Sequence, residues 1–340
     1  MSKKNTSFSI WRRIATFLML ALAAGLIGAN WFVHEPRAWR EKQTASWPAP
    51  IVQTVENLGH AFADYTDALG LSGSDVSVDL PVFTPPNGVA FGGLPVPIPG
   101  GAARTDVVIL QKQTFMLGWS PSLRHAVWAA YRVSPTQTPL DLMRPSSFSQ
   151  DTAARNAPRS ADYARSGYDR GHLVPNHAIA SRFGKKAQVE TFLTSNIAPQ
   201  RPALNQGPWA DVERRIADDW PDRFGDIWVI VGTISPQQRQ TLAAGINIPT
   251  AFYQIVVARH ADRVRAFAVV MPQRISRLAR PRVTLATIDE IEQLSGFDFL
   301  SALPDEEETA LEAGRPTRLW PSGFRSVVSI IRRRLGVYSN

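Results

Sequence analysis

The stretch that decides the fold is YDRGHLVPN, residues 168–176. It places a carboxylate, Asp169, a permanent cation, Arg170, and an imidazole, His172, within four residues, and Gly171 lets the backbone turn sharply between them. A neutral histidine accepts a proton from water near neutral pH, and an arginine holds a phosphate through two hydrogen bonds. The pattern therefore indicates a phosphate-handling site, with a structural salt bridge beside a surface histidine as the alternative.

Two further segments follow this motif, SNIAPQ at 195–200 and LNQGPW at 204–209. We expect a helix at about 208–219, because Pro208 suits a first helical turn and four apolar residues recur at helical spacing: Trp209, Val212, Ile216 and Trp220. Asn205 stands at the expected start of this helix, and Glu213 projects toward the same side about two turns further on. An amide oxygen with a nearby carboxylate suits Mg²⁺, whereas a plain helix cap is the alternative for Asn205.

Segments rich in β-branched and aromatic residues surround these motifs. We expect strands at 106–117, 125–133, 227–233, 251–258 and 264–271, the first two joined as a hairpin through 118–121. Further helices are expected at 188–192 and 285–295. Strands and helices are interspersed without a repeating βαβ rhythm, so the sequence predicts an α+β fold with a mixed, largely antiparallel sheet.

Composition excludes several classes of protein. A chain of 340 residues with 44% hydrophobic residues can bury a sizeable core, and the absence of cysteine excludes disulfide scaffolds, thiolate zinc sites and cysteine nucleophiles. The net charge of +8 belongs to the two ends, because residues 1–45 hold seven Lys/Arg against two Glu and residues 315–340 hold six Arg and no acid. The body between them is slightly acidic, so net charge alone does not indicate nucleic-acid binding.

Four segments are expected along the chain. Residues 1–45 hold a basic flank and an uncharged run from 14 to 33, which predicts an N-terminal hydrophobic helix, either an uncleaved signal anchor or a cleaved signal peptide. Residues 46–104 combine an amphipathic helix with a Pro/Gly-rich linker or extended arm, and residues 105–312 form the mixed α+β domain. Residues 313–340 form a basic amphipathic tail that suits a membrane surface, nucleic-acid phosphates or docking on the domain.

The motifs, in this order and spacing, resemble those of a known family. YDRGHLVPN resembles the DRGH signature of the DNA/RNA non-specific endonucleases, which have a ββα-metal (His-metal finger) core, and SNIAPQ, LNQGPW and Glu213 resemble that family's metal-binding helix. The likeness covers about residues 105–312. It implies a Mg²⁺-dependent, sequence-non-specific endonuclease that hydrolyses phosphodiester bonds of DNA and RNA, with Mn²⁺ as a substitute for Mg²⁺.

The resemblance also implies a role for each motif residue. His172 would be the general base that activates water, Asn205 the direct metal ligand, and Glu213 the holder of metal-bound water. Asn196 would position His172 or the water shell of the metal, and Arg170 would stabilise charge on the scissile phosphate.

Five other residues receive supporting or candidate roles. Asp169 and Gly171 are expected to support the loop structurally. The family's arginine one helical turn after Glu213 falls on Ala217, so Arg214 or Arg215 is a candidate substrate contact in its place. His177 is either a further substrate contact or a solvated loop residue.

Two other functions are consistent with the same sequence. One is a phosphodiesterase of this fold that acts on other phosphodiesters, and the other is a catalytically silent, membrane-tethered nucleic-acid-binding protein that uses its Arg-rich tail. The expected partners are DNA and RNA, with the membrane through the N-terminal segment, while a homodimer and an inhibitor protein are left open. The expected location is the inner membrane facing the periplasm, or the periplasm or cell exterior if the N-terminal segment is cleaved.

Overall fold

The computed structural model describes residues 24–29, 42–52, 54–55, 58, 62, 75–80, 88–101, 106–136, 138–236, 240–260 and 262–321. The chain divides into two units, residues 72–322 and residues 1–71 with 323–340. In the second unit, residues 24–29 are helical and fall inside the predicted hydrophobic helix. None of the described helices has the length and apolar character needed to cross a membrane. The rest of the predicted anchor, and the tail beyond residue 321, lie outside the described residues.

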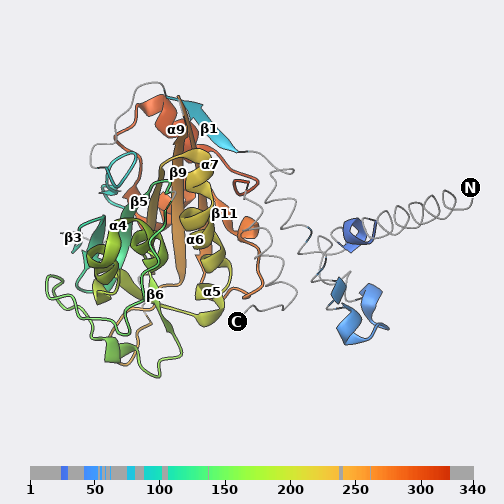
Figure 1. The fold of residues 1–340 in the computed structure, drawn as a ribbon, viewed down its shortest axis with the longest axis horizontal. Coiled ribbons are helices and arrows are strands. Elements are labelled where there is room, and N and C mark those ends of the chain that lie inside the picture. Colours follow the sequence, from blue (N-terminus) through green and yellow to red (C-terminus); the bar gives the residue numbers. More distant parts are fainter. Residues whose placement is uncertain are drawn as a thin grey trace, which may run out of the picture. The chain divides into compact units, whose positions relative to one another are not determined.

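The main unit is built on an antiparallel sheet that has eight strands among the described residues, in the order β1-β10-β9-β8-β5-β4-β3, with β11 beside β10 (Figure 1). The strands are β1 Val76–Asp79, β3 Val108–Gln111, β4 Phe115–Ser120, β5 His125–Val133, β8 Ile227–Ile234, β9 Ala251–His260, β10 Arg263–Pro272 and β11 Leu285–Ala286. This mixed fold with a large antiparallel sheet confirms the predicted fold class.

The hairpin predicted through residues 118–121 is shifted in the structure. The expected strand at 106–117 is itself a hairpin, in which β3 ends at Gln111 and β4 runs from Phe115 to Ser120. Gly118 lies within β4 because it packs under the indole of Trp128, where an added Cβ would lie 2.3 Å from the ring. This glycine is therefore needed for close packing and does not mark a turn.

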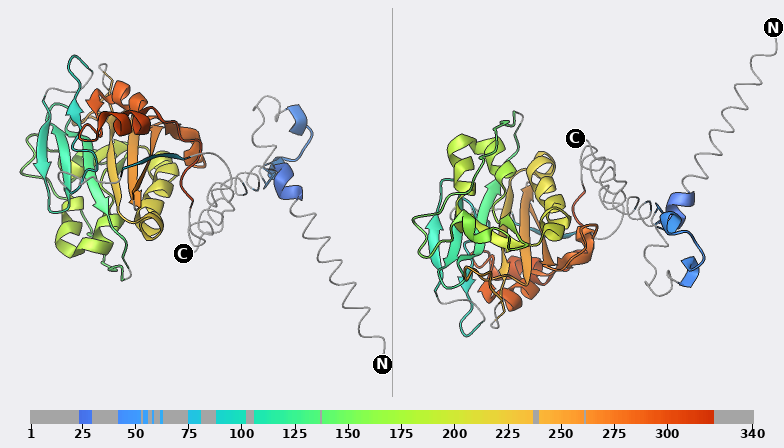
Figure 2. Two further views of the ribbon diagram at one scale, coloured as in Figure 1. Left: turned by 90° about the horizontal axis from the view of Figure 1, so that it is seen from above. Right: turned by 90° about the horizontal axis from the view of Figure 1, so that it is seen from below.

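Helices cover both faces of the sheet (Figure 2). One face carries α4 Asn176–Thr191, α5 Pro202–Asn205, α6 Pro208–Asp218 and α7 Trp220–Phe224, and the other carries α8 Ile288–Ser295 and α9 Asp305–Ala313. Alternate residues of β5 enter the two cores, Tyr131 on the first face and Trp128 on the second. The central strands are buried on both faces, which explains their nearly continuous apolar sequence.

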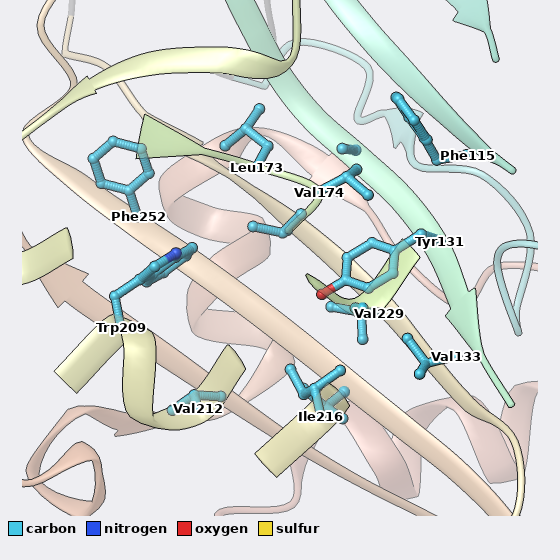
Figure 3. Close-up of a cluster of buried hydrophobic side chains, with 14 of the residues drawn as sticks. Phe115, Tyr131, Val133, Leu173, Val174, Trp209, Val212, Ile216, Val229 and Phe252 are labelled. Carbon is cyan, nitrogen blue, oxygen red and sulfur yellow. The ribbon is translucent and has the colours of Figure 1, made fainter. Parts of the chain in front are cut away.

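Helix α6 is held on the sheet by an apolar stripe. Trp209, Val212 and Ile216 are fully buried and point toward the sheet (Figure 3). The ring of Trp209 packs edge-on against Phe252 of β9, with 5.6 Å between the ring centroids. Trp220, the last residue of the predicted stripe, is also buried but begins the separate helix α7. The stripe fixes which side of α6 remains free to line a site.

The DRGH motif forms a small hairpin outside the main sheet. Strand β6 Asp169–His172 pairs antiparallel with β7 Ile197–Gln200, and α4 and the short 3₁₀ helix Thr194–Asn196 connect them. Helix α4 is much longer than the predicted helix at 188–192. Gly184, with a φ of 82°, interrupts it, so its apolar spacing is broken along the sequence.

The remaining short elements lie at the edges of the unit. Strand β2 Val96–Pro97 pairs with β12 Phe297–Asp298, and 3₁₀ helices span Ser160–Tyr163 and Pro281–Thr284. The described part of the predicted linker, residues 88–101, runs along the second face, where Phe91 is buried against Trp228. After α9, Trp320 is buried against Trp220, so the chain up to residue 321 packs on the first face.

Candidate active site

A cavity of about 390 Å³ gathers most of the predicted site residues. His172 and Arg170 reach it from β6, Asn205 from the end of α5, and Glu213 with Arg214 from α6. These residues are spread over more than forty positions of the sequence, and the β6–β7 hairpin and α6 bring them to one place. Five of the residues predicted from the motifs therefore share one cavity.

His172 is held as a neutral imidazole. The rings of Phe148 and Phe192 flank it, with centroids 5.3 Å and 5.2 Å away. Burial, together with the positive charge of Arg144, lowers the pKa of His172 from 6.5 to about 3. Its Nε2 atom is buried and has no hydrogen-bond partner among the described residues. At physiological pH the ring is therefore uncharged, and one of its two ring nitrogens carries a free lone pair.

Asn205 is oriented by Asp169. Its Nδ2 donates to Asp169 Oδ2 at 2.8 Å, and Gln206 Nε2 donates to the same oxygen at 2.9 Å. Because the amide nitrogen is held in this way, the amide oxygen of Asn205 is the atom available to a cation. Asp169 thus has the supporting position that was expected for it.

The local structure around Asn205 differs from the expectation. Asn205 is the last residue of α5 and does not begin α6, whose N-cap is Gly207. A Cβ at Gly207 would lie 2.3 Å from the carbonyl oxygen of Ala203, so this sharp connection between the helices requires glycine. The plain helix-cap interpretation of Asn205 is therefore wrong.

Glu213 is a partly buried residue whose carboxyl group lines the cavity. Trp209 Nε1 donates to its Oε1 at 3.0 Å. Burial raises the pKa of Glu213 from 4.5 to about 8, although the Trp209 hydrogen bond and the charges of Arg144 and Arg214 act in the opposite direction. The neighbouring Tyr131 hydroxyl is buried without a partner among the described residues. A cation at this site would restore the charge of the carboxylate, so the donor set fits a hard divalent metal ion.

Asn196 and Gly171 shape the hairpin around His172. Asn196 Oδ1 accepts from Val174 N at 2.9 Å, and its Nδ2 donates to the carbonyl oxygens of Val174 at 2.9 Å and Thr191 at 3.0 Å. Asn196 is fully buried and ties the residues after His172 to the end of α4. Gly171 lies against Gln200, whose Oε1 would be 2.3 Å from an added Cβ. Both residues therefore act on the backbone that carries His172.

Arginine side chains supply the positive charge of the cavity. Arg170 donates from Nε to the Ser160 carbonyl at 3.3 Å and lies over the Phe148 ring. Arg144 is exposed and lies 5.2 Å over the Phe192 ring, and its positive charge acts on both His172 and Glu213. Sequence reasoning missed Arg144 because it lies in the polar loop between β5 and β6, where no motif or periodicity marks it.

The two arginines proposed as substrate contacts have different surroundings. Arg214 lines the cavity and lies 3.6 Å from Asp211. Arg215 is only 3% exposed and does not line the cavity, because the helical rotation from Arg214 turns it into the protein. The structure therefore brings only Arg214 to the site.

His177 lies at the edge of the cavity in the first turn of α4. Its Nε2 is 2.6 Å from Asp218 Oδ1 of α6, and this hydrogen bond raises the pKa of His177. The side chain is solvent-exposed as expected, but the expectation of a loop is wrong, because His177 is helical and paired with Asp218. The pair connects α4 to α6 beside the position of Ala217.

Comparison with known proteins agrees with this architecture. The sequence pattern of the DNA/RNA non-specific endonuclease family matches residues 96–306, more than half of the chain, and the chain belongs to this family. The family membership confirms the resemblance seen in the sequence and makes the protein a hydrolytic nuclease.

Several individual proteins are similar to this chain. Mitochondrial endonuclease G of Bos taurus is 28% identical over 301 residues, which cover 83% of this chain and 92% of that protein. The nuclease of Serratia marcescens is 24% identical over 236 residues, which cover 63% of this chain and 82% of that protein. A crystal structure of the EndoG/EndoGI complex contains a chain with the same fold, at a TM-score of 0.53 and 22% identity, covering 58% of this chain and 88% of that one.

Proposed function

We propose that the protein is a Mg²⁺-dependent endonuclease that hydrolyses DNA and RNA without sequence specificity. The observation that carries this proposal is that a neutral histidine, an oriented amide oxygen and a carboxyl group, from His172, Asn205 and Glu213, line one cavity. This combination supplies a proton acceptor and a metal-binding donor set within one site.

The proton acceptor in the proposed reaction is His172. Its lowered pKa keeps the ring neutral before the reaction, and the negative charge of a bound phosphate would raise this pKa and so strengthen His172 as a base toward the attacking water. The flanking Phe148 and Phe192 rings restrict its orientation, and Asn196 holds the following backbone. His172 is thus positioned by packing on its sides and by hydrogen bonds behind it.

Asn205 and Glu213 are the residues that would hold Mg²⁺, Asn205 directly and Glu213 through water. When bound, the ion supplies polarisation of the phosphate and stabilises charge on the leaving oxygen. Asp169 keeps the amide oxygen of Asn205 available by binding its nitrogen. Mn²⁺ has similar oxygen chemistry and is expected to substitute.

Arg144 and Arg170 are the proposed phosphate contacts. Both line the cavity, and their guanidinium groups lie over aromatic rings that limit their motion. Contacts to phosphate fix the position of a nucleic acid without reading its bases. This arrangement supports hydrolysis without sequence specificity.

The proposed setting is outside the cytoplasm, either anchored in the inner membrane or exported. The support is the basic flank followed by the uncharged run at residues 14–33. A nuclease of this kind in the cytoplasm would reach the genome of its own cell.

A cleavage assay on the purified full-length chain tests the proposal. Plasmid DNA, single-stranded DNA and RNA are incubated with Mg²⁺ or with EDTA, alongside His172→Ala and Asn205→Ala. We expect Mg²⁺-dependent degradation of all three substrates and a loss of about 10²–10⁴-fold in both variants. His177→Ala is the matched control, because it removes an imidazole from the same cavity, and it should keep its activity within about tenfold.

Two results would contradict the proposal. Intact nucleic acids from a folded protein that still hydrolyses a small phosphodiester, such as bis(p-nitrophenyl) phosphate, would favour a different phosphodiesterase. Full activity in either His172→Ala or Asn205→Ala would remove the assigned residue from the mechanism.

A further inference from the structure

A second group of chemically active side chains lies far from the cavity in the fold. Asp289 and Glu292 of α8, Asp298 of β12, and Glu308 and Glu312 of α9 form a group that we call the acidic cluster. Helices α8 and α9 cover the second face of the sheet, whereas α4, α5 and α6 build the cavity on the first. The sheet therefore separates the acidic cluster from the nuclease site.

The carboxylate oxygens of the acidic cluster converge. One ligand oxygen from each of Asp289, Glu292 and Glu312 lies within 4.8 Å of the other two, and the same holds for Asp298, Glu308 and Glu312. Oxygens on opposite sides of a bound Ca²⁺ are about 5 Å apart, since each Ca–O distance is about 2.4 Å. Each group of three is thus compact enough to share one ion, and Glu312 belongs to both.

Glu312 gives an independent indication of a ligand. It is only 8% exposed, and its Oε1 is buried without a hydrogen-bond partner among the described residues. An isolated buried carboxylate is costly unless a cation or hydrogen bonds compensate it. The neighbouring Glu292 accepts a hydrogen bond from Phe299 N at 2.8 Å, and its carboxyl group also hydrogen-bonds with the Glu312 carboxyl, which leaves Glu312 Oε1 as the unpaired oxygen.

Nearby basic side chains are engaged elsewhere. Arg315, two residues beyond α9, pairs with Glu290, and Arg318 pairs with Asp75 at 2.9 Å. The charged groups that act on Glu312 are all carboxylates: Glu292, Glu308, Asp298 and Asp289. Burial and this repulsion raise the pKa of Glu312 to about 9. The described part of the chain therefore offers the acidic cluster no basic side chain, and without a cation Glu312 holds a proton at neutral pH.

We propose that the acidic cluster binds one divalent cation, Ca²⁺, with Glu312 as the central ligand, and that this ion fastens α9 to α8. Ca²⁺ fits better than Mg²⁺ because it accepts six to eight oxygen ligands in flexible geometry, including several carboxylates, whereas Mg²⁺ keeps most of its waters. The ion would neutralise the converging carboxylates and stabilise the folded state relative to the unfolded chain. Its role is structural and does not depend on the proposed nuclease mechanism.

Thermal unfolding of the full-length chain tests this site without an activity measurement. The melting temperature is measured in EDTA and in increasing CaCl₂, in the Asn205→Ala background, which removes the ligand proposed for the catalytic metal. We expect the melting temperature to rise with the logarithm of the Ca²⁺ concentration. Equilibrium dialysis with radioactive Ca²⁺ should find one ion per chain, and added Glu312→Gln should abolish both signals.

Two more variants keep the test specific. Glu306→Gln removes the same charge from the exposed side of α9 and should leave the Ca²⁺ response unchanged. Asp298→Asn provides a second variant within the acidic cluster and should weaken Ca²⁺ binding about tenfold, since ligand charge sets the affinity of such sites.

The opposite results would overturn the proposal. An unchanged Ca²⁺ response in Glu312→Gln would place the ion elsewhere. If Ca²⁺ neither binds to nor stabilises the Asn205→Ala chain, Glu312 is simply a protonated buried acid and the acidic cluster is no cation site.

Discussion

Replacing Glu213 by Gln should remove a pH-dependent loss of stability from the metal-free protein. Burial raises the pKa of this carboxyl from 4.5 to about 8 in the folded protein. In the unfolded chain a glutamate titrates at about 4.3. Between these values the folded state holds a proton that the unfolded state has released, so the free energy of unfolding falls as pH rises.

The size of the effect follows from the two pKa values. From about pH 6 to about pH 8 the unfolded chain stays ionised at this position while the folded protein is largely protonated, so the free energy of unfolding should fall by about 2 kcal/mol. Glu213→Gln carries no titrating proton and should keep this stability. The amide oxygen can still accept the hydrogen bond that Trp209 Nε1 makes to Glu213 Oε1 at 3.0 Å, so the substitution chiefly removes the charge.

Urea unfolding followed by tryptophan fluorescence measures this difference. Wild type and Glu213→Gln are compared in EDTA at about pH 6 and about pH 8. For each protein, the change in the free energy of unfolding between the two pH values is calculated. Subtracting the change in Glu213→Gln from that in wild type cancels the contribution of groups that titrate in both proteins. Glu306→Gln, on the exposed side of α9, is the control and should behave as wild type. An equal pH dependence in wild type and Glu213→Gln would refute the assignment of a raised pKa to Glu213.

Three further substitutions test other parts of the site. Gly171→Ala should destabilise the protein by about 1–3 kcal/mol, because the new Cβ would lie 2.6 Å from Gln200 Cβ, and an unchanged melting temperature would contradict this close packing. Arg144→Ala should raise the KM for plasmid DNA more than it lowers kcat, and should reduce the slope of log affinity against log salt by about one, whereas an unchanged slope would exclude a phosphate contact. Asp169→Asn should weaken activation by Mg²⁺ about tenfold, because Asn205 loses its charged hydrogen-bond partner, and a titration of the cleavage rate with Mg²⁺ would show whether it does.

The central strands could be predicted closely because both of their faces are buried. Strand β5 spans His125–Val133, as expected from its β-branched and aromatic residues. The preceding hairpin could not be placed, since the turn at residues 112–114 contains neither Gly nor Pro. Gly118 instead looked like a turn residue, although its actual reason is the indole of Trp128.

In the site, too, residues within sequence motifs could be predicted, whereas a residue brought in by long-range folding could not. His172, Asn205 and Glu213 stand in motifs with informative spacing, so their shared cavity was accessible from the sequence. Arg144 was not, because only the path of a long loop brings it to the imidazole. Arg215 had the right chemistry in an adjacent position, but one step along a helix turns a side chain by about 100° and buries this one.

The bond between Asp169 and Asn205 couples two parts of the proposed machinery. Asp169 begins the strand that ends at His172, and Asn205 ends the short helix that carries the amide. This hydrogen bond therefore links the strand that carries the proposed proton acceptor to the helix that carries the proposed metal-binding oxygen. Arg144 reaches the cavity from a separate loop. A change in the loop that carries Arg144 should therefore alter the proposed phosphate contact and leave the spacing of the two proposed reacting groups unaltered.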